Sequence, residues 1–404
     1  MRDNPTVTVL VMDEAGSKYE TKDISGLSHF LEHMCFKGTV KRPKAIDIAR
    51  ELDSIGAQYN AFTSQEWTGY YAKSDSRHLD KIIDVVSDMY LNPVFNDVEI
   101  EKEKGVICEE INMYEDQPMR HIYDLWMRLL YGDQPAGWNV AGTKRIVKKL
   151  TRDDFINYRR KHYVAAATAV IVAGQVDETQ VTKKIEESFK NISAENKFAK
   201  TAVRDKQAKP SVLLKYKKTD QTHLMIGTRS FDAYHDNNKI VRLILAILSG
   251  GMSSRLFQKL RDEMGVCYYV NADNDAFTDH GTFYVSAGVD SGRVKEVITS
   301  ILGELNKLSE VSIESAELRK VKDYLIGNLF LSLESSDAQA NFYGSQEILK
   351  KPIKTPEELV REIEKVDAES IRNVANQIFN TKNLNLAIIG KFKDRAEFLP
   401  ILKF

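Results

Sequence analysis

The chain has 404 residues, of which 43% are hydrophobic and 28% are charged. This composition is typical of a folded globular protein and excludes a disordered or collagen-like chain. The 57 Lys and Arg residues nearly balance the 58 Asp and Glu residues, which leaves a formal net charge of −1. We therefore expect no nucleic-acid partner, because such binders carry a clear basic excess. At roughly 150 residues per domain, the length favours two domains.

The sequence also lacks the features of membrane and secreted proteins. No apolar stretch approaches the roughly 20 residues that a membrane-spanning helix needs, so we expect no membrane partner. Residues 1–5 lead directly into an alternating segment and lack the sections of a signal peptide. The three cysteines have no CxxC spacing and are too few for a disulfide framework. As written, the chain is predicted to be cytoplasmic.

In chain order, the first half mixes strand and helix patterns. Residues 6–12 alternate like a strand, and two short aromatic segments at 58–62 and 68–73 predict a hairpin. The apolar run 169–174 predicts a buried strand. Helical patterns occupy residues 25–37, 43–55, 78–91, 98–114, 121–131, 151–162 and 178–189. Apolar content then falls across 191–209, which predicts an exposed connection between domains.

The second half resembles the first in pattern. Residues 386–390 echo the strand at 170–174, roughly 215 residues later. Chance similarity of common strand patterns is the alternative. We predict an α+β fold of two homologous domains, 1–195 and 196–404, each a mainly antiparallel sheet packed with helices. Because residues 253–254 are serines where the first half has histidines, only the first domain is expected to carry the chemistry described next.

His29, Glu32 and His33 form an H-x-x-E-H array in a predicted helix. At about 100° per residue, the two histidines lie roughly 40° apart and the glutamate falls on the same stripe. Zn²⁺ binds imidazole nitrogens and leaves one position for water, whose proton Glu32 can accept as a general base. Chance alone places this pattern in a chain of this length on the order of 0.01 times. The array therefore predicts the zinc site of a peptidase.

A catalytic zinc site needs a third protein ligand, and the predicted helix at 98–114 is rich in glutamates. Glu110 shares a stripe with Ile107, which indicates the inward face, whereas Glu109 lies on a polar stripe that indicates solvent. We predict Glu110 as the ligand. Glu103, two turns earlier and about 20° away, is predicted to orient the site. An ordinary exposed helical acid is the alternative for Glu103.

Two segments together resemble a known family. Residues 26–39, in which H-x-x-E-H is followed by F-K-G-T, resemble the zinc-site segment of the pitrilysin or insulinase metallopeptidases, the inverzincins. Residues 103–110 are similar to the family's second signature, whose last glutamate is the third zinc ligand, in agreement with Glu110. The resemblance spans almost the whole chain. It is closest to the short bacterial relatives of the mitochondrial processing peptidase β subunit.

This resemblance implies half-clamshell domains and a zinc-dependent endopeptidase with one Zn²⁺ per chain, which cleaves peptides or unfolded segments in an enclosed chamber. Arg261 and Tyr268, seven residues apart, resemble the family's paired Arg and Tyr, which implies that they stabilise the oxyanion. An ordinary surface Arg and core Tyr are the alternative. The resemblance further implies an edge strand that binds extended substrate, for which a plain hairpin strand is the alternative. That strand consists of Asn60, Ala61, Phe62 and Thr63.

Short members of the family pair with a facing partner subunit. We therefore expect a homodimer, or a heterodimer with a homologous subunit that lacks the motif. In a homodimer, Arg261 and Tyr268 can complete the site of the other protomer. A non-catalytic scaffold of the same fold is a second hypothesis, against which the intact zinc and base set argues. Family members usually have one more strand before residues 6–12, so we expect either a truncated start, with any targeting peptide lost, or a first sheet without that strand.

Overall fold

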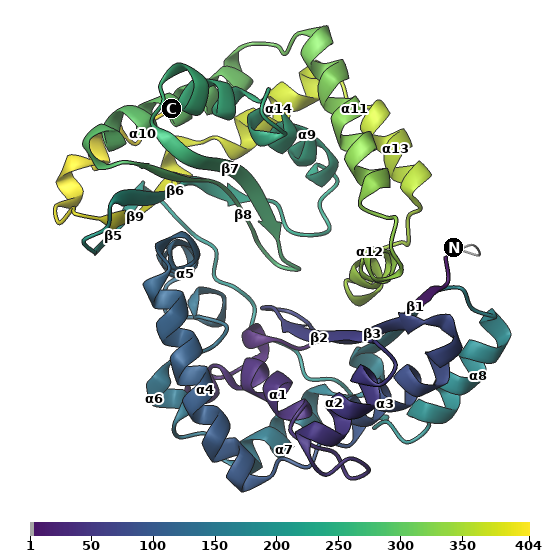
Figure 1. Cartoon of the computed structure of the whole chain (residues 1–404). Coiled ribbons are helices and arrows are strands. Elements are labelled where there is room, and N and C mark those ends of the chain that lie inside the picture. The colour runs from purple at the N-terminus through teal and green to yellow at the C-terminus, as the bar shows by residue number, and fades with distance from the viewer. Residues whose placement is uncertain (1–3) are drawn as a thin grey trace. The chain divides into compact units, whose positions relative to one another are not determined.

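The computed structural model describes residues 4–404, which divide into two compact units (Figure 1). Unit 1 consists of Met1–Met113, Trp138–Thr201 and Ser332–Ile353, and unit 2 consists of Tyr114–Gly137, Ala202–Leu331 and Lys354–Phe404. The central boundary, between Thr201 and Ala202, lies in the predicted connection. The predicted division into 1–195 and 196–404 differs from these units because each unit includes a helical segment from the other half of the sequence.

Unit 1 is built on an antiparallel sheet with the strand order β2-β3-β1-β4. Its strands are β1 (Thr6–Asp13), β2 (Gln58–Thr63), β3 (Thr68–Asp75) and β4 (Thr168–Gly174). β2 and β3 form the predicted hairpin. Among the described residues no strand pairs with the outer side of β2, so this strand is an open edge of the sheet.

Helices cover both faces of this sheet, and β1 is buried between them. α3 (Leu79–Leu91) packs against β1 and β3, and α12 (Ser336–Ile348) packs against β1 and β4 (Figure 1). Alternate residues of β1 therefore enter different clusters, Val9 and Val11 in the main core and Leu10 and Met12 beside α12. The other helices of this part are α1 (Leu27–Cys35), α2 (Ala45–Asp53), α4 (Asp97–Asp116), α6 (Lys144–Val147), α7 (Arg152–His162) and α8 (Glu178–Phe189).

Unit 2 repeats this plan with one more strand. Its sheet has the order β5-β9-β6-β8-β7, in which β5 is parallel to β9 and the other neighbours are antiparallel. The strands are β5 (Ser211–Tyr216), β6 (Gln221–Ser230), β7 (Cys267–Ala276), β8 (Gly281–Asp290) and β9 (Asn385–Gly390). The order β7-β8-β6-β9 corresponds to β2-β3-β1-β4, which confirms the predicted duplicated α+β fold.

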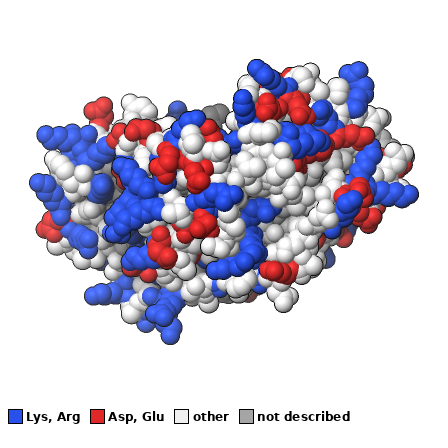
Figure 2. Space-filling model, turned by 90° about the horizontal axis from the view of Figure 1, so that it is seen from below, with Lys and Arg blue, Asp and Glu red and all other residues white. Residues whose placement is uncertain are grey.

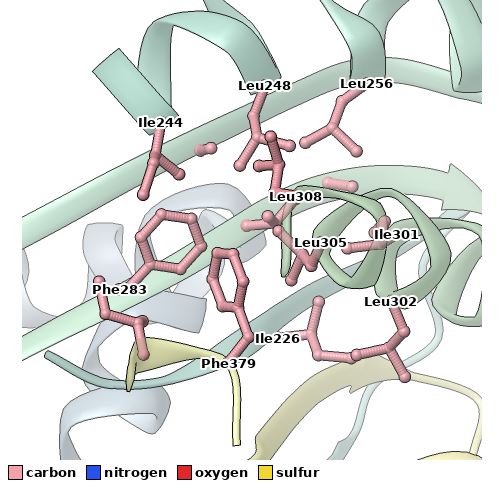
Figure 3. Packing of buried hydrophobic residues seen from close by; sticks show 14 of the residues in the cluster. Ile226, Ile244, Leu248, Leu256, Phe283, Ile301, Leu302, Leu305, Leu308 and Phe379 are labelled. Atoms are coloured by element: carbon pink, nitrogen blue, oxygen red, sulfur yellow. The ribbon is translucent and has the colours of Figure 1, made fainter. Parts of the chain in front are cut away.

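The main core of unit 2 lies between its sheet and its helices. Figure 3 shows leucine and isoleucine side chains of two helices packed against Phe283 of β8 and against Phe379. The two phenylalanine rings meet edge to face with centroids 5.1 Å apart. The helices are α5 (Pro118–Tyr131), α9 (Asn238–Ser249), α10 (Val294–Glu310), α11 (Ser315–Leu331), α13 (Pro356–Glu364) and α14 (Ala368–Ile378), with a π-helical segment at Phe257–Glu263.

The exchanged helices α5 and α12 occupy equivalent places in the two units. α5 packs against β6 and β9, where buried Trp126 donates its indole N–H to Thr282 Oγ1 at 3.0 Å. On unit 1, Gly344 of α12 lies so close to β1 that a Cβ there would come within 2.8 Å of Met12 Sδ. Each half of the sequence thus provides a helix for the sheet of the other half.

The charge and hydropathy of the described residues agree with the composition. No helix in the described range 4–404 is long and apolar enough to cross a bilayer. On the face seen in Figure 2, basic and acidic side chains are intermixed, as the net charge of −1 suggests. All three cysteines, Cys35, Cys108 and Cys267, are buried thiols without disulfide bonds.

Candidate metal centre and active site

Helix α1 is amphipathic: one side is apolar and buried, and the other side carries two of the predicted metal ligands. Phe30, Leu31 and Met34 are buried, and the ring of Phe30 packs edge to face on Phe155 of α7 with centroids 4.9 Å apart. The opposite side of the helix carries the H-x-x-E-H side chains, which are partly exposed. Burial of the apolar face therefore fixes the direction in which the three polar side chains point.

Two histidines of α1 and one glutamate of α4 converge on one point. The Nε2 atoms of His29 and His33 lie 3.6 and 3.5 Å from Oε2 of Glu110. One ligand atom from each of the three residues lies within 4.8 Å of the others. A tetrahedral zinc site, with bonds of about 2.0 to 2.1 Å, places its ligand atoms about 3.3 Å apart. Residue types, number and spacing therefore fit Zn²⁺, and within residues 4–404 no second such group of His, Cys, Asp and Glu is found.

Glu103 is hydrogen-bonded to the ring of His33. Its Oε1 lies 2.9 Å from His33 Nδ1, and its Oε2 accepts from Lys37 Nζ at 2.6 Å. Burial raises the pKa of Glu103, but the bonds from His33 and Lys37 outweigh it, so the pKa is lowered overall. A metal-binding histidine usually has a carboxylate as the outer partner of its second ring nitrogen. Glu103 occupies this position at Nδ1 of His33, so Nε2 can face Glu110. The structure thus places Glu103 where the helical phase predicted it.

The two histidines have different electrostatic surroundings. Burial, together with the neighbouring ring of His33, lowers the pKa of His29 to about 4, which keeps this imidazole neutral, as a metal ligand must be. Burial also lowers the pKa of His33, but the bond to Glu103 and the charges of Glu110 and Glu32 raise it overall. Nδ1 of His29 is buried and has no hydrogen-bond partner among the described residues.

Glu32 lies beside the ligand cluster and is held by the edge strand. Thr63 Oγ1, at the end of β2, donates to Glu32 Oε2 at 2.5 Å. Burial raises the pKa of Glu32, and the Thr63 bond opposes this effect. A carboxyl group whose pKa is raised towards neutrality suits a general base. Only one carboxylate oxygen of Glu32 is engaged by Thr63, so the other can meet a reacting water.

A cavity of about 300 Å³ opens beside Glu32 and His33. Its wall includes Phe36 and Tyr59, whose rings are stacked with centroids 6.5 Å apart. The lining consists of Glu32, His33, Phe36, Lys37, Tyr59, Asn60 and Glu103. Sequence reasoning missed Lys37, Phe36 and Tyr59; the first two lie within the F-K-G-T signature, and the aromatic pattern of β2 was read only as a strand.

The predicted substrate-binding residues belong to β2, and their side chains make different contacts. Asn60 lines the cavity, Thr63 holds Glu32, and the ring of Phe62 covers Gly69. The backbone N–H of Ala61 donates to the side chain of Asn60 at 2.9 Å and not to β3. Because N–H groups alternate in direction along an antiparallel strand, the N–H of Ala61 faces the open edge.

Arg261 and Tyr268 belong to unit 2, whereas the metal cluster belongs to unit 1. Arg261 is exposed in the π-helical segment and lies over the ring of Phe257, 5.0 Å from its centroid. Tyr268 is 75% exposed at an irregularity in the pairing of β7 with β8. Such bulges redirect a side chain away from the regular pleat. Both side chains are therefore available at the surface of their unit.

Comparisons with known proteins agree with this geometry. Residues 2–144 match the family described as Insulinase (Peptidase family M16), and residues 149–325 match the Peptidase M16 inactive domain. A Bacillus subtilis protein named Uncharacterized zinc protease YmxG is 34% identical over 96% of this chain and 95% of its own length. An uncharacterized zinc protease of Streptomyces coelicolor is 32% identical over 96% of this chain and 86% of its own length.

Two solved structures have the same fold. A protease from Helicobacter pylori superposes with a TM-score of 0.88 at 21% identity and covers 95% of this chain and 94% of its own. A peptidase M16 inactive domain from Pseudomonas fluorescens superposes with a TM-score of 0.90 at 17% identity, covering 97% and 95%.

The cluster makes a direct prediction for Glu110 and its neighbour. Glu110→Gln removes the anionic ligand and should weaken Zn²⁺ binding by more than the roughly 10- to 100-fold typical of a lost outer partner. Glu109→Gln is the matched control, because Glu109 is exposed and bonded to Asn112. Zinc dissociation constants measured by competition with a chromophoric chelator test this; equal affinity of the two variants would contradict the assignment.

Proposed function

Because the chain belongs to the insulinase (M16) family of peptidases, we propose that it is a zinc-dependent endopeptidase. The observation that carries this proposal is the convergence of His29, His33 and Glu110 on one point, with Glu32 beside them. The relatives from Bacillus subtilis and Streptomyces coelicolor are both named zinc proteases, which supports the same reaction class.

In the proposed mechanism, His29, His33 and Glu110 hold one Zn²⁺ per chain. When bound, the ion would supply a Lewis acid and lower the pKa of a coordinated water towards 7. Glu32 accepts a proton from the attacking water at Oε1, the oxygen that is not bonded to Thr63, and returns it to the leaving amine. Glu103 holds the ring of His33 throughout.

The proposed substrates are peptides or unfolded segments enclosed in a chamber. The open edge of β2 can pair only with an extended backbone, which folded proteins rarely offer. The cavity walled by Phe36 and Tyr59, next to Glu32, offers room for one apolar side chain of the bound peptide. Main-chain pairing fixes the direction of the substrate, while this cavity provides side-chain selectivity.

We also propose that Arg261 and Tyr268 stabilise the developing oxyanion and that the chain forms a homodimer. Both side chains are exposed on unit 2, and a guanidinium and a phenol can each donate to a carbonyl oxygen as negative charge develops. We propose that each chain supplies this pair to the metal centre of its partner. A heterodimer with a homologous subunit is the alternative outcome of the mixing experiment below.

Glu32→Gln separates catalysis from metal binding. The amide cannot accept a proton, so turnover of a quenched fluorescent peptide should fall by at least about 100-fold. Zinc content should stay at the wild-type level, because Glu32 is outside the ligand cluster. Full turnover in a zinc-loaded Glu32→Gln chain would remove Glu32 from the mechanism, and Glu109→Gln should behave like the wild type.

Ala61→Pro tests the edge strand. Proline removes the outward N–H and is tolerated at strand edges, so the chain should fold while KM rises roughly 2- to 12-fold, the effect of one backbone hydrogen bond. Ala61→Ser keeps the N–H and serves as the control with unchanged KM. An unchanged KM in a folded Ala61→Pro chain would argue against substrate pairing at this position.

Mixing two inactive chains tests the homodimer. If Tyr268 acts on the partner's site, a Glu32→Gln chain mixed with a Tyr268→Phe chain should recover about a quarter of wild-type activity after subunit exchange, because half of the dimers then hold one intact site. No recovery despite proven exchange would place Tyr268 in its own chain's site. A monomeric mass by light scattering without activity would favour a heterodimer with a homologous partner chain.

A further inference from the structure

The N-terminus of helix α1 is capped by a residue from outside the helix. Its N-cap residue is Gly26, which has no side chain and has a φ of 99°. Glu20 takes over this function: Oε2 accepts the N–H of Gly26 at 2.7 Å, and Oε1 accepts the N–H of Ser28 at 2.6 Å. The first N–H groups of a helix otherwise lack partners. Both carboxylate oxygens of Glu20 are therefore used to hold the start of α1.

Glu20 is a buried carboxyl group whose hydrogen-bond partners come from the helix itself. Its residue is only 3% exposed, and no cationic side chain pairs with it in the described part of the chain. Burial raises the pKa of Glu20 to about 8, and the N–H groups of Ser28 and Gly26 oppose this rise. A carboxylate also interacts favourably with the positive end of a helix dipole. The two backbone N–H groups at the start of α1 thus offset the free-energy cost of burying the Glu20 carboxyl group.

The segment that carries Glu20 is fixed to the turn after β2. The N–H groups of Ser17 and Lys18 donate to the carbonyl oxygens of Ser64 and Gln65 at 3.2 and 2.8 Å. Buried Lys18 also pairs with Glu66, with Nζ 2.8 Å from Oε1. This turn directly follows Thr63, which holds Glu32.

Two further contacts tighten this segment. A Cβ on Gly16 would come within 2.3 Å of the carbonyl oxygen of Ser64, so only glycine permits this approach. The hydroxyl of Tyr158 lies 2.8 Å from Ser28 Oγ and donates to the carbonyl oxygen of Gly16 at 3.1 Å. Residues 16–20 therefore touch both the start of α1 and the end of the edge hairpin.

We propose that Glu20 is a positioning residue of the metal centre. It fixes the start of α1 relative to the turn that follows the edge strand β2. A helix of nine residues is too short to be stable alone, since isolated helices below about 12 to 15 residues are marginal. His29 is only three residues beyond Gly26, so fraying of the first turn displaces a ligand. This inference rests on the proposed zinc peptidase function and extends it to a residue that touches neither metal nor substrate.

The test uses the full chain and measures zinc affinity separately from stability. Glu20→Gln keeps the size of the side chain but places an amide NH₂ against a backbone N–H. Asp88→Asn is the matched control: Asp88 is also a buried carboxyl group of unit 1, and it accepts from Arg42 Nη1 at 2.7 Å and from Thr39 Oγ1 at 2.5 Å, with no hydrogen bond to a residue of α1 among the described residues. Circular dichroism and melting curves establish the temperature at which each chain is folded.

For folded Glu20→Gln, the zinc dissociation constant should rise on the order of tenfold, as for other residues that act through a ligand. Turnover of the zinc-loaded chain should fall with little change in KM. Asp88→Asn should melt earlier than the wild type but keep its zinc affinity. Wild-type zinc affinity in Glu20→Gln, or an equal loss in Asp88→Asn, would overturn the inference.

If Glu20→Gln does not fold, zinc affinity is measured on Glu20→Asp instead. It keeps the carboxyl group but shortens the side chain by one methylene, so its zinc affinity should lie below that of the wild type; an unchanged affinity would overturn the inference. Failure of the wild-type chain itself to bind zinc would instead contradict the proposed function as a whole. The two failures are therefore distinguishable.

Discussion

The site depends on one constraint: two helices must bring three ligand atoms within 4.8 Å of one another and hold them there. Two of these atoms are imidazole nitrogens and the third is a carboxylate oxygen, all partly buried, and the two imidazoles differ on their outer sides: Nδ1 of His29 has no hydrogen-bond partner among the described residues, whereas Nδ1 of His33 has one. For His33 this partner is Glu103, 70 residues away in sequence. Much of the polar structure around α1 follows from this requirement.

Two sets of hydrogen bonds and ion pairs surround the predicted metal ligands. On one side, Lys37 neutralises Glu103, which in turn orients His33. On the other side, Thr63 holds Glu32, and the turn after Thr63 is fixed by the segment that carries Glu20. Backbone hydrogen bonds, a buried ion pair and a helix cap thus link the metal helix to the edge of the sheet without any direct contact with a metal ion.

Duplication explains how one unit can carry the predicted metal ligands while the other does not. Four strands of unit 2 repeat the strand order of unit 1, and in unit 2 the residues before the π-helical segment include Ser253 and Ser254 in place of histidines. The fold therefore does not require the ligands. The second matched family, described as an inactive domain, covers residues 149–325, which include Ser253 and Ser254 but none of His29, His33 and Glu110.

Sequence reasoning succeeded where a local rule determines the geometry. The helical period alone separated Glu110 from Glu109 and placed Glu103 behind the ligands, and the family resemblance that these motifs indicated is confirmed. It failed where long-range contacts decide. The cap from Glu20 depends on a loop of irregular backbone.

The exchange of α5 and α12 could not be predicted either, because it depends on which sheet buries each apolar helix face. A repeat in the sequence shows that two copies exist. It does not show which copy receives each helix.

The most direct test is the metal content of the purified chain, measured by elemental analysis beside cleavage of a quenched fluorescent peptide. The account predicts about one zinc ion per chain, loss of cleavage with a chelator and its return when zinc is added back. Cleavage that survives complete removal of zinc, or a folded chain that binds no zinc in a metal-replete buffer, would contradict it.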